Sequence, residues 1–185
     1  MKEIMVDLEV CREGVELPVY AHEGDSGMDV TAQYIQKYYR ADLYLKDNKI
    51  QHSERKYNDE ELEITNKAFG ISSISLYPNH RCLIMTGIKV NHIPEGYEIQ
   101  IRPKSGNSLK LGLEVVNSPG TIDSNYRGEI GVISKNGGGN SIFITKGMKI
   151  AQLVLCPVSK MKFGKTSTTD NSTRGEGGFG STGTH

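Results

Sequence analysis

The sequence lacks the features that define several large classes of protein. Its 185 residues contain no apolar run long enough to span a membrane, so no membrane partner is predicted. Lys plus Arg and Asp plus Glu both number 22, which leaves no cationic surplus for general binding to nucleic acid. Cys11, Cys82 and Cys156 are odd in number and far apart, which indicates neither a disulfide framework nor a zinc site. The N-terminal residues are too charged for a signal peptide, and we expect a cytoplasmic protein.

Short strands are predicted over the second half of the chain. Residues 97–103 alternate between apolar and polar side chains, the pattern of a strand with one buried face. Residues 128–134 and 141–145 are rich in β-branched residues, and the glycines of 136–139 are typical of a turn between them. Residues 150–158 are almost wholly apolar, which predicts a strand in the middle of a sheet. Because no helical pattern separates these strands, the sequence favours an all-β sandwich or barrel.

Residues 33–69 differ in composition and read as an insertion into this β-domain. They hold seven Lys/Arg, seven Asp/Glu and five of the nine tyrosines. Such a balanced run of charge predicts a solvated face, or alternatively a surface for a protein partner.

The secondary structure of the insertion is only partly indicated. Residues 58–69 carry helix signals, with Asn or Asp as the N-cap, acidic residues in the first turn and Gly70 just past the end. Residues 42–50 fit a hairpin, whereas Ile35 and Tyr39 begin a stripe with helical spacing. The sequence does not decide between a hairpin and a helix for this part of the segment.

The composition changes again after residue 162, to Gly, Ser, Thr and charge without periodicity. The apolar content is too low to offset the roughly 1–2 kcal/mol per residue that ordering costs. We therefore divide the chain into a β-domain at 1–162, interrupted by the insertion, and a flexible arm at 163–185. The Gly-Lys-Thr at 164–166 lacks the earlier glycine of a P-loop, and the spaced glycines of 175–180 have no helix after them, so neither is interpreted as a phosphate motif.

Four polar positions in the β-domain are candidates for chemistry. Residues 102–110 offer a cation, a hydroxyl and bare backbone, as a phosphate-binding turn does, although an ordinary polar turn has the same composition. Asp123 lies with Tyr126 in a predicted hairpin, where it is either a catalytic carboxylate or part of an Asx-turn. Asp29 follows a glycine turn and is a metal or water ligand, or a turn carboxylate. Gln152 interrupts an apolar strand, so it serves the core or points into a site.

These positions, together with the glycine-rich arm and its one arginine and one aromatic residue, supply what a nucleoside triphosphate requires. The negative charge of the triphosphate requires Mg²⁺ and a cationic side chain, and its base requires an aromatic face on which to stack. Attack by water requires a general base. Five segments, four in the β-domain and one in the arm, also resemble, in order, the motifs of the homotrimeric dUTP pyrophosphatase (dUTPase) family. They are SGMDV (26–30), RPKSGNS (102–108), GTIDSNYRGEIGV (120–132), GMKIAQLV (147–154) and RGEGGFGSTG (174–183).

The third and fifth motifs are highly specific to that family. The resemblance covers about residues 1–32 and 70–185, which leaves the insertion unmatched. It implies a jelly-roll β-barrel that assembles as a homotrimer, with three active sites each built from all three chains. It also implies hydrolysis of dUTP to dUMP and pyrophosphate with Mg²⁺, which limits uracil in DNA and supplies dUMP for dTMP synthesis.

The family resemblance assigns a role to each candidate residue. Asp123 would orient and deprotonate the water that attacks the α-phosphorus, and Asp29 would hold waters of Mg²⁺. Uracil would enter the hairpin at 117–131, and Tyr126 would pack against the deoxyribose and exclude a 2′-hydroxyl. The other substrate contacts expected from the β-domain are Lys104, Ser105, Gly106, Asn117, Gly120, Thr121, Ile122, Gly131 and Gln152.

The arm would act as a lid over the site of a neighbouring chain. Phe179 would stack on uracil and Gly180 would let the backbone wrap closely, since closure of this kind excludes water. The γ-phosphate would be held by Arg174, Ser181 and Thr182.

Three residues of the motifs depart from the family pattern. Met28 stands where an aromatic is common and Met148 where an aspartate is frequent. Lys104 replaces the usual arginine, which keeps the charge but loses the bidentate fork.

Two alternative functions are weighed against dUTP hydrolysis. A dCTP deaminase, or a bifunctional deaminase-dUTPase, shares the implied fold but requires a glutamate base inside the strand after the hairpin. Here that strand has no acid after Glu129. A regulatory protein that binds a partner through residues 33–69 is the other alternative.

Overall fold

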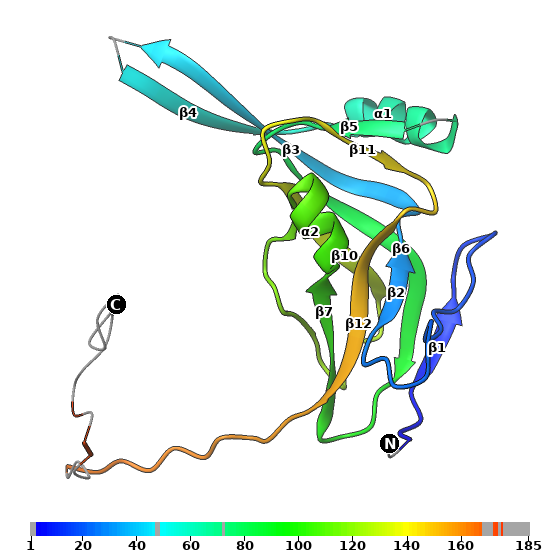
Figure 1. Ribbon diagram of the computed structural model, residues 1–185, viewed down its shortest axis with the longest axis vertical. Helices are drawn as coiled ribbons and strands as arrows, with labels where there is room; N and C mark the ends of the chain where they lie inside the picture. The colour runs from blue at the N-terminus through cyan, green and yellow to red at the C-terminus, as the bar shows by residue number, and fades with distance from the viewer. Residues whose placement is uncertain (1–2, 47–48, 72, 168–171, 174, 176–185) are drawn as a thin grey trace.

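The computed structural model describes residues 3–46, 49–71, 73–167, 172–173 and 175, and β-strands are its main regular structure (Figure 1). The prediction of an all-β fold is confirmed. In chain order the elements are β1 (Asp7–Val10), β2 (Met28–Thr31), β3 (Tyr34–Lys46), β4 (Lys49–Lys56), α1 (Asp59–Ile71), β5 (Ser73–Leu76), β6 (Arg81–His92), β7 (Tyr97–Pro103), α2 (Ser105–Leu111), β8 (Leu113–Val115), β9 (Gly120–Ile122), β10 (Glu129–Asn136), β11 (Ile142–Thr145) and β12 (Lys149–Pro157).

Two antiparallel sheets form the body of the molecule. The larger has the strand order β4-β3-β6-β10-β8, with β1 also paired to β6. The smaller has the order β2-β12-β7-β9, and β5 pairs separately with β11. The apolar strand β12 therefore lies between two neighbours, as the sequence predicted.

The core is formed by the inward side chains of both sheets. Ile99 and Ile101 on β7 are buried between more exposed polar neighbours, which confirms the alternation predicted for residues 97–103. A buried aliphatic side chain of this size contributes about 1.5–3 kcal/mol relative to an exposed one. Six branched side chains at the centre are Ile84, Val90, Ile130, Val132, Ile144 and Ile150.

The charged segment 33–69 begins as a strand of the central sheet. The first part of β3 pairs with β6, and Ile35 and Tyr38 on it are buried in the core. The strands β3 and β4 then pair with each other, so this part of the segment forms a hairpin and not a helix. The far end of this hairpin projects beyond the other strands of the larger sheet (Figure 1). The start of the expected insertion is thus part of the β-domain.

Helix α1 begins at a capping box. The Glu61 N–H donates to Asn58 Oδ1 at 2.9 Å, and the Asn58 N–H donates to Glu61 Oε2 at 2.9 Å, which confirms the predicted cap. The prediction that Gly70 ends the helix is wrong, because α1 continues to Ile71. A glycine inside a helix costs only about 1 kcal/mol, so the packing of the buried Leu62 can outweigh it.

The chain leaves the body after β12. Residues 158–167 have no regular secondary structure and run outward from the sheets (Figure 1). Most of the predicted arm, including Arg174, Phe179, Gly180, Ser181 and Thr182, lies outside the described residues. No helix in the described part of the chain is long and apolar enough to cross a membrane.

Candidate active site

A pocket of about 260 Å³ gathers most of the residues that the sequence predicted for the nucleoside. The predicted residues in its lining are Asn117, Gly120, Thr121, Ile122, Asp123, Tyr126 and Gly131. Six residues that were not predicted complete the lining: Gln36, Leu83, Met85, Ile101, Glu129 and Ile133. We call this cavity the nucleoside pocket.

The nucleoside pocket lies where the chain crosses from one sheet to the other. β9 pairs with β7 in the smaller sheet, whereas β10 pairs with β6 and β8 in the larger one. The prediction of a simple hairpin at 117–131 is therefore corrected, since β9 and β10 belong to different sheets. The reason is that Ile122 is buried against the core and its backbone pairs with Ile99. Because the chain passes from one sheet to the other here, residues of both β9 and β10 line the pocket.

Asp123 and Tyr126 lie in a tight turn at the pocket. The Tyr126 N–H donates to the Asp123 carbonyl oxygen at 3.0 Å, and the side chain of Asp123 is exposed. The Tyr126 hydroxyl donates to the Glu129 carbonyl oxygen at 2.8 Å. The Tyr126 ring packs on Gly128, and a side chain at position 128 would collide with the Tyr126 ring. An accessible carboxylate beside a cavity can hold and activate a water molecule.

The back of the nucleoside pocket is apolar and close-packed. Gly131 pairs with Met85 and Ile133 with Leu83 across β10 and β6. A methyl group at Gly131 would come within 2.8 Å of Leu83 Cδ1, so a larger residue there would require the Leu83 side chain to shift. No local sequence pattern reveals Leu83 or Met85 as pocket residues, because the register between distant strands puts them there.

A second polar cluster forms around Asp29 on β2. The Lys104 ammonium pairs with Asp29 Oδ1, and the Lys149 ammonium lies 3.0 Å from Asp29 Oδ2. Burial would raise the pKa of Asp29, but the hydrogen bonds and charges of the two lysines outweigh it and lower the pKa below the ordinary value. Asp29 is therefore ionised at neutral pH. We call Asp29, Lys104, Lys149 and Gln152 the phosphate cluster.

Gln152, a member of this cluster, is part-buried. It lies opposite Asp29 in the pairing of β12 with β2, and its amide donates to the Pro103 carbonyl oxygen at 2.9 Å. A side chain at Gly27 would collide with the Gln152 amide, which accounts for glycine in the turn before Asp29. The polarity of Gln152 within an apolar strand predicted a special role for it, whereas Lys149 lies in the fourth motif but was given no role there.

Ser105 and Gly106 form the first turn of α2. The expectation of a polar turn at 102–110 is corrected, because Ser105 begins a helix that ends at Gly112 in the left-handed conformation. The first N–H groups of a helix have no acceptor within it, so they can donate to an anion beside Lys104. This short helix thus extends the phosphate cluster.

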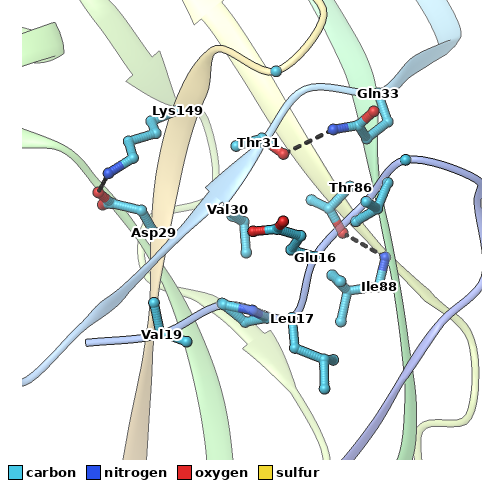
Figure 2. Close-up of a pocket in the computed structure, with 14 residues that line it drawn as sticks. Glu16, Leu17, Val19, Asp29, Val30, Thr31, Gln33, Thr86, Ile88 and Lys149 are labelled. Carbon is cyan, nitrogen blue, oxygen red and sulfur yellow. Dashed lines mark hydrogen bonds and ion pairs between the residues drawn. The ribbon is translucent and has the colours of Figure 1, made fainter. Parts of the chain in front are cut away.

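The nucleoside pocket and the phosphate cluster occupy different places on the chain. Asp29 and Lys149 line a separate cavity of about 290 Å³, beside the loop that contains Glu16 and Leu17 (Figure 2). Asp123 lines the nucleoside pocket and not this one. The cavities found among the described residues do not bring the two carboxylates together.

The described residues contain no group of three His, Cys, Asp or Glu side chains that could hold a metal ion directly. Asp29 is a single carboxylate, which suits contact through water with a hydrated ion. Mg²⁺ beside phosphates commonly keeps several of its waters in this way.

A sequence model of the dUTPase family matches residues 71–183 of the chain. The chain belongs to the dUTPase family. The deoxyuridine 5′-triphosphate nucleotidohydrolase of Clostridium tetani is 38% identical over 183 residues, which are 99% of each chain. The enzyme of the same name from Chlamydia pneumoniae is 55% identical over 111 residues, which are 60% of this chain and 76% of the relative. The Clostridium alignment includes the segment 33–69, so this segment is not peculiar to the present dUTPase.

Solved structures agree with the fold. A dUTPase mutant of Staphylococcus bacteriophage 80alpha, determined with dUpNHpp, superposes with a TM-score of 0.69. It covers 97% of this chain and 98% of that chain at 22% sequence identity. The jelly-roll fold expected from the motifs is therefore confirmed.

Proposed function

We propose that this protein hydrolyses dUTP to dUMP and pyrophosphate. The observation that carries the proposal is the nucleoside pocket, which joins Asp123, Tyr126, Asn117 and residues 120–122 in one cavity. Membership of the dUTPase family supports the same reaction. By limiting dUTP and supplying dUMP, such a cytoplasmic enzyme would keep uracil out of DNA and support dTMP synthesis.

Uracil would be read by backbone groups of the nucleoside pocket. Asn117, Gly120, Thr121 and Ile122 present a chain edge with little side-chain bulk, which can imitate a base-pairing partner. Behind Gly131 lie the apolar side chains of Leu83 and Met85. We propose that these side chains leave no room for the methyl group of thymine.

Asp123 would act as the general base of the reaction. Its exposed carboxylate at the pocket can accept a proton from water attacking the α-phosphorus. The bond from that phosphorus to the bridging oxygen then breaks, and pyrophosphate leaves. Proton transfer to a positioned side chain commonly contributes about 10²–10⁴ in rate.

The phosphate cluster would bind the triphosphate. Lys104 supplies charge, Ser105 and Gly106 supply N–H groups, and Gln152 supplies an amide beside them. Asp29 would hold waters of Mg²⁺, which neutralises charge on the phosphates when it is bound. Phosphate oxygens offer Lys104 a second partner besides Asp29.

A homotrimer would unite the two halves of the site. The separation of Asp123 from Asp29 within one chain supports a site in which neighbouring chains supply different halves. The arm 163–185 would then close over it, with Phe179 on the base and Arg174, Ser181, Thr182 and Gly180 around the γ-phosphate. An extended segment that leaves the body after β12 is suited to reach another chain.

A dCTP deaminase is less well supported. The first residue of β10, Glu129, is the acid nearest to the position of a deaminase base, but its carboxylate is paired with Arg12 at 2.8 Å.

The experiment that tests the proposed function is a panel of dUTP, dCTP, dTTP and UTP with Mg²⁺, with pyrophosphate, ammonia and nucleotide products measured. We expect dUMP and pyrophosphate from dUTP alone. Ammonia from dCTP, or no product from dUTP, would contradict the proposal.

The β3–β4 hairpin is a candidate surface for a protein partner in addition to catalysis. It projects from the sheets, and β4 is the outermost strand of the larger sheet (Figure 1). Because β3 starts in the core, deletion of residues 33–69 would also remove core residues. The test of a partner surface therefore deletes only residues 41–54. Unchanged dUTP turnover together with lost capture of a partner would support this second role.

A further inference from the structure

The pairing of β6 with β10 is interrupted beside the nucleoside pocket. Glu129 pairs with Lys89 and Gly131 with Met85, so a single residue of β10 faces three residues of β6. A bulge of this kind leaves backbone groups without partners in the ladder. Side chains must then take the place of those partners.

Two side chains replace the missing partners at this bulge. Thr86 Oγ1 donates to the Ile130 carbonyl oxygen at 2.9 Å. Glu129 Oε1 accepts from the Gly87 N–H at 2.8 Å. Gly87 has a φ of 75° and is crowded by Arg12 and Val15, so the N-terminal segment packs directly on the bulge.

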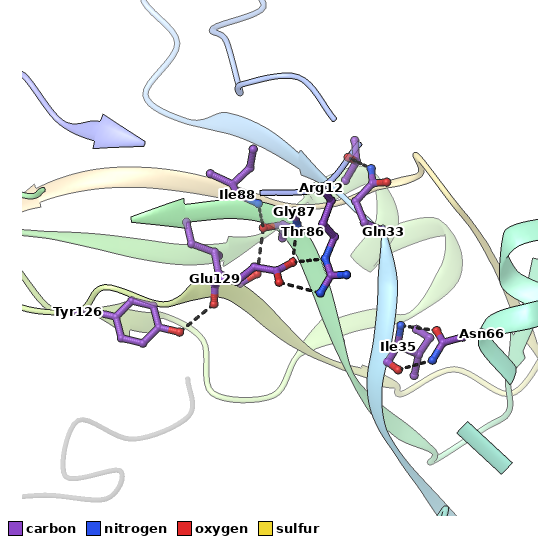
Figure 3. Close-up of polar contacts among 11 residues, drawn as sticks. Arg12, Gln33, Ile35, Asn66, Thr86, Gly87, Ile88, Tyr126 and Glu129 are labelled. Atoms are coloured by element: carbon purple, nitrogen blue, oxygen red, sulfur yellow. Dashed lines mark hydrogen bonds and ion pairs between the residues drawn. The ribbon is translucent and has the colours of Figure 1, made fainter. Parts of the chain in front are cut away.

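Arg12 clamps the Glu129 carboxylate from the other side (Figure 3). Its Nε donates to Glu129 Oε1 and its terminal nitrogen to Oε2, both at 2.8 Å. The guanidinium also lies 4.9 Å from the centre of the Tyr34 ring. Paired forks of this kind fix orientation as well as distance. The side chain of Glu129 is 16% exposed, so the pair is largely shielded on that side.

The backbone of the clamped residue holds Tyr126. The Tyr126 hydroxyl donates to the Glu129 carbonyl oxygen at 2.8 Å, so one residue is fixed by Arg12 and in turn fixes the tyrosine (Figure 3). Tyr126 is 42% exposed, and its ring packs on Gly128, which has no side chain to hold it. The hydrogen bond to Glu129 therefore matters for where the ring stands.

We propose that Arg12 is a positioning residue for sugar recognition, acting through Glu129 on Tyr126. The inference rests on the proposed function, in which Tyr126 excludes a ribose 2′-hydroxyl. Exclusion of one hydroxyl depends on the position of the ring to within about 1 Å, and errors of that size cost up to about 10² in rate. Arg12 lies outside all five motifs, and its role follows from a contact between residues 117 positions apart.

The first test compares dUTP with UTP. We expect Arg12→Ala to lower the ratio of kcat/KM for dUTP over UTP by roughly tenfold. Arg12→Lys should recover part of the ratio, because lysine keeps the charge without the fork. The matched control is Glu9→Gln, which removes another ion pair to β6, with Lys89 at 3.6 Å. An unchanged ratio in folded Arg12→Ala protein would overturn the proposal.

A double-mutant cycle tests the route through Tyr126. Tyr126→Phe keeps the ring but removes the hydrogen bond to Glu129. In that background, Arg12→Ala should change the dUTP/UTP ratio no further. Independent, additive effects of the two substitutions would contradict a positioning role.

Hydrogen exchange separates failure of this inference from failure of the proposed function. A wild-type protein that does not cleave dUTP would refute the function but leave the clamp measurable. Amides of residues 124–128 should then exchange faster in Arg12→Ala than in wild type or Glu9→Gln. Equal exchange in all three proteins would overturn the clamp itself.

Discussion

The nucleoside pocket and the phosphate cluster are built in opposite ways. The nucleoside pocket is made of backbone and apolar side chains brought together by the registers of two sheets. The phosphate cluster is made of charged and amide side chains on β2, β12 and the residue after β7. We propose that shape selects the base and sugar, whereas charge binds the phosphates. The proposed general base then lies in one half of the site and the cations lie in the other.

The largest expected effect comes from removing the general base. Asp123→Asn keeps the shape of the nucleoside pocket, so dUTP should still bind. Turnover should fall by about 10²–10⁴, because the amide does not accept the proton from water. Steady-state kinetics and equilibrium binding of dUTP check the two parts of this prediction. A near wild-type rate would end the assignment of Asp123.

Removal of the arm should have the next largest effect. A chain that ends before Arg174 should lose roughly a hundredfold in turnover, because the open site admits water and loses its contacts to base and phosphate. Its melting temperature should stay close to wild type, since the core residues lie before β12 ends. Full activity of the truncated enzyme would contradict the lid.

The smallest effect concerns the stability provided by the phosphate cluster. The pKa of Asp29 lies below its ordinary value of 3.8, so its pairing stabilises the fold above that pH and is lost as the pH falls through the lowered pKa. Asp29→Asn should cost about 1 kcal/mol at neutral pH and nothing in strong acid. Thermal unfolding across this range checks the prediction.

The control for that experiment is an exposed ion pair. Glu95→Gln removes the partner of Lys160, and both side chains of this pair are largely exposed. It should leave stability nearly unchanged at neutral pH. A pH-independent difference between wild type and Asp29→Asn would show that the lysines do not stabilise the carboxylate.

Local patterns predicted the elements well but not how distant strands meet. The strand at 97–103, the cap at Asn58 and the central position of β12 follow from alternation, capping chemistry and apolar content, all of which are local. The helix end at Gly70 and the turn at Ser105 were wrong, because tertiary packing and a continuing helix override weak local signals.

The candidate site shows the same division. Asp123, Tyr126 and Asp29 could be predicted because they lie in short motifs. Leu83 and Arg12 could not, because their roles depend on the pairing of β6 with β10 and on an ion pair across the chain. Lys149 lies in the fourth motif, but its contact with Asp29 depends on β12 lying beside β2. The sequence contains these residues but no periodic signal for the contacts.

The most direct measurement of the divided site is complementation between two inactive variants. Asp123→Asn damages the nucleoside half and Lys104→Ala the phosphate half, and co-expression mixes them within trimers. If each site takes its halves from different chains, roughly a quarter of the sites regain both intact halves in a one-to-one mixture. We predict that dUTP turnover of the mixture rises to about that fraction of wild type. Activity no higher than that of the separate variants would contradict the account, because both halves would then come from one chain.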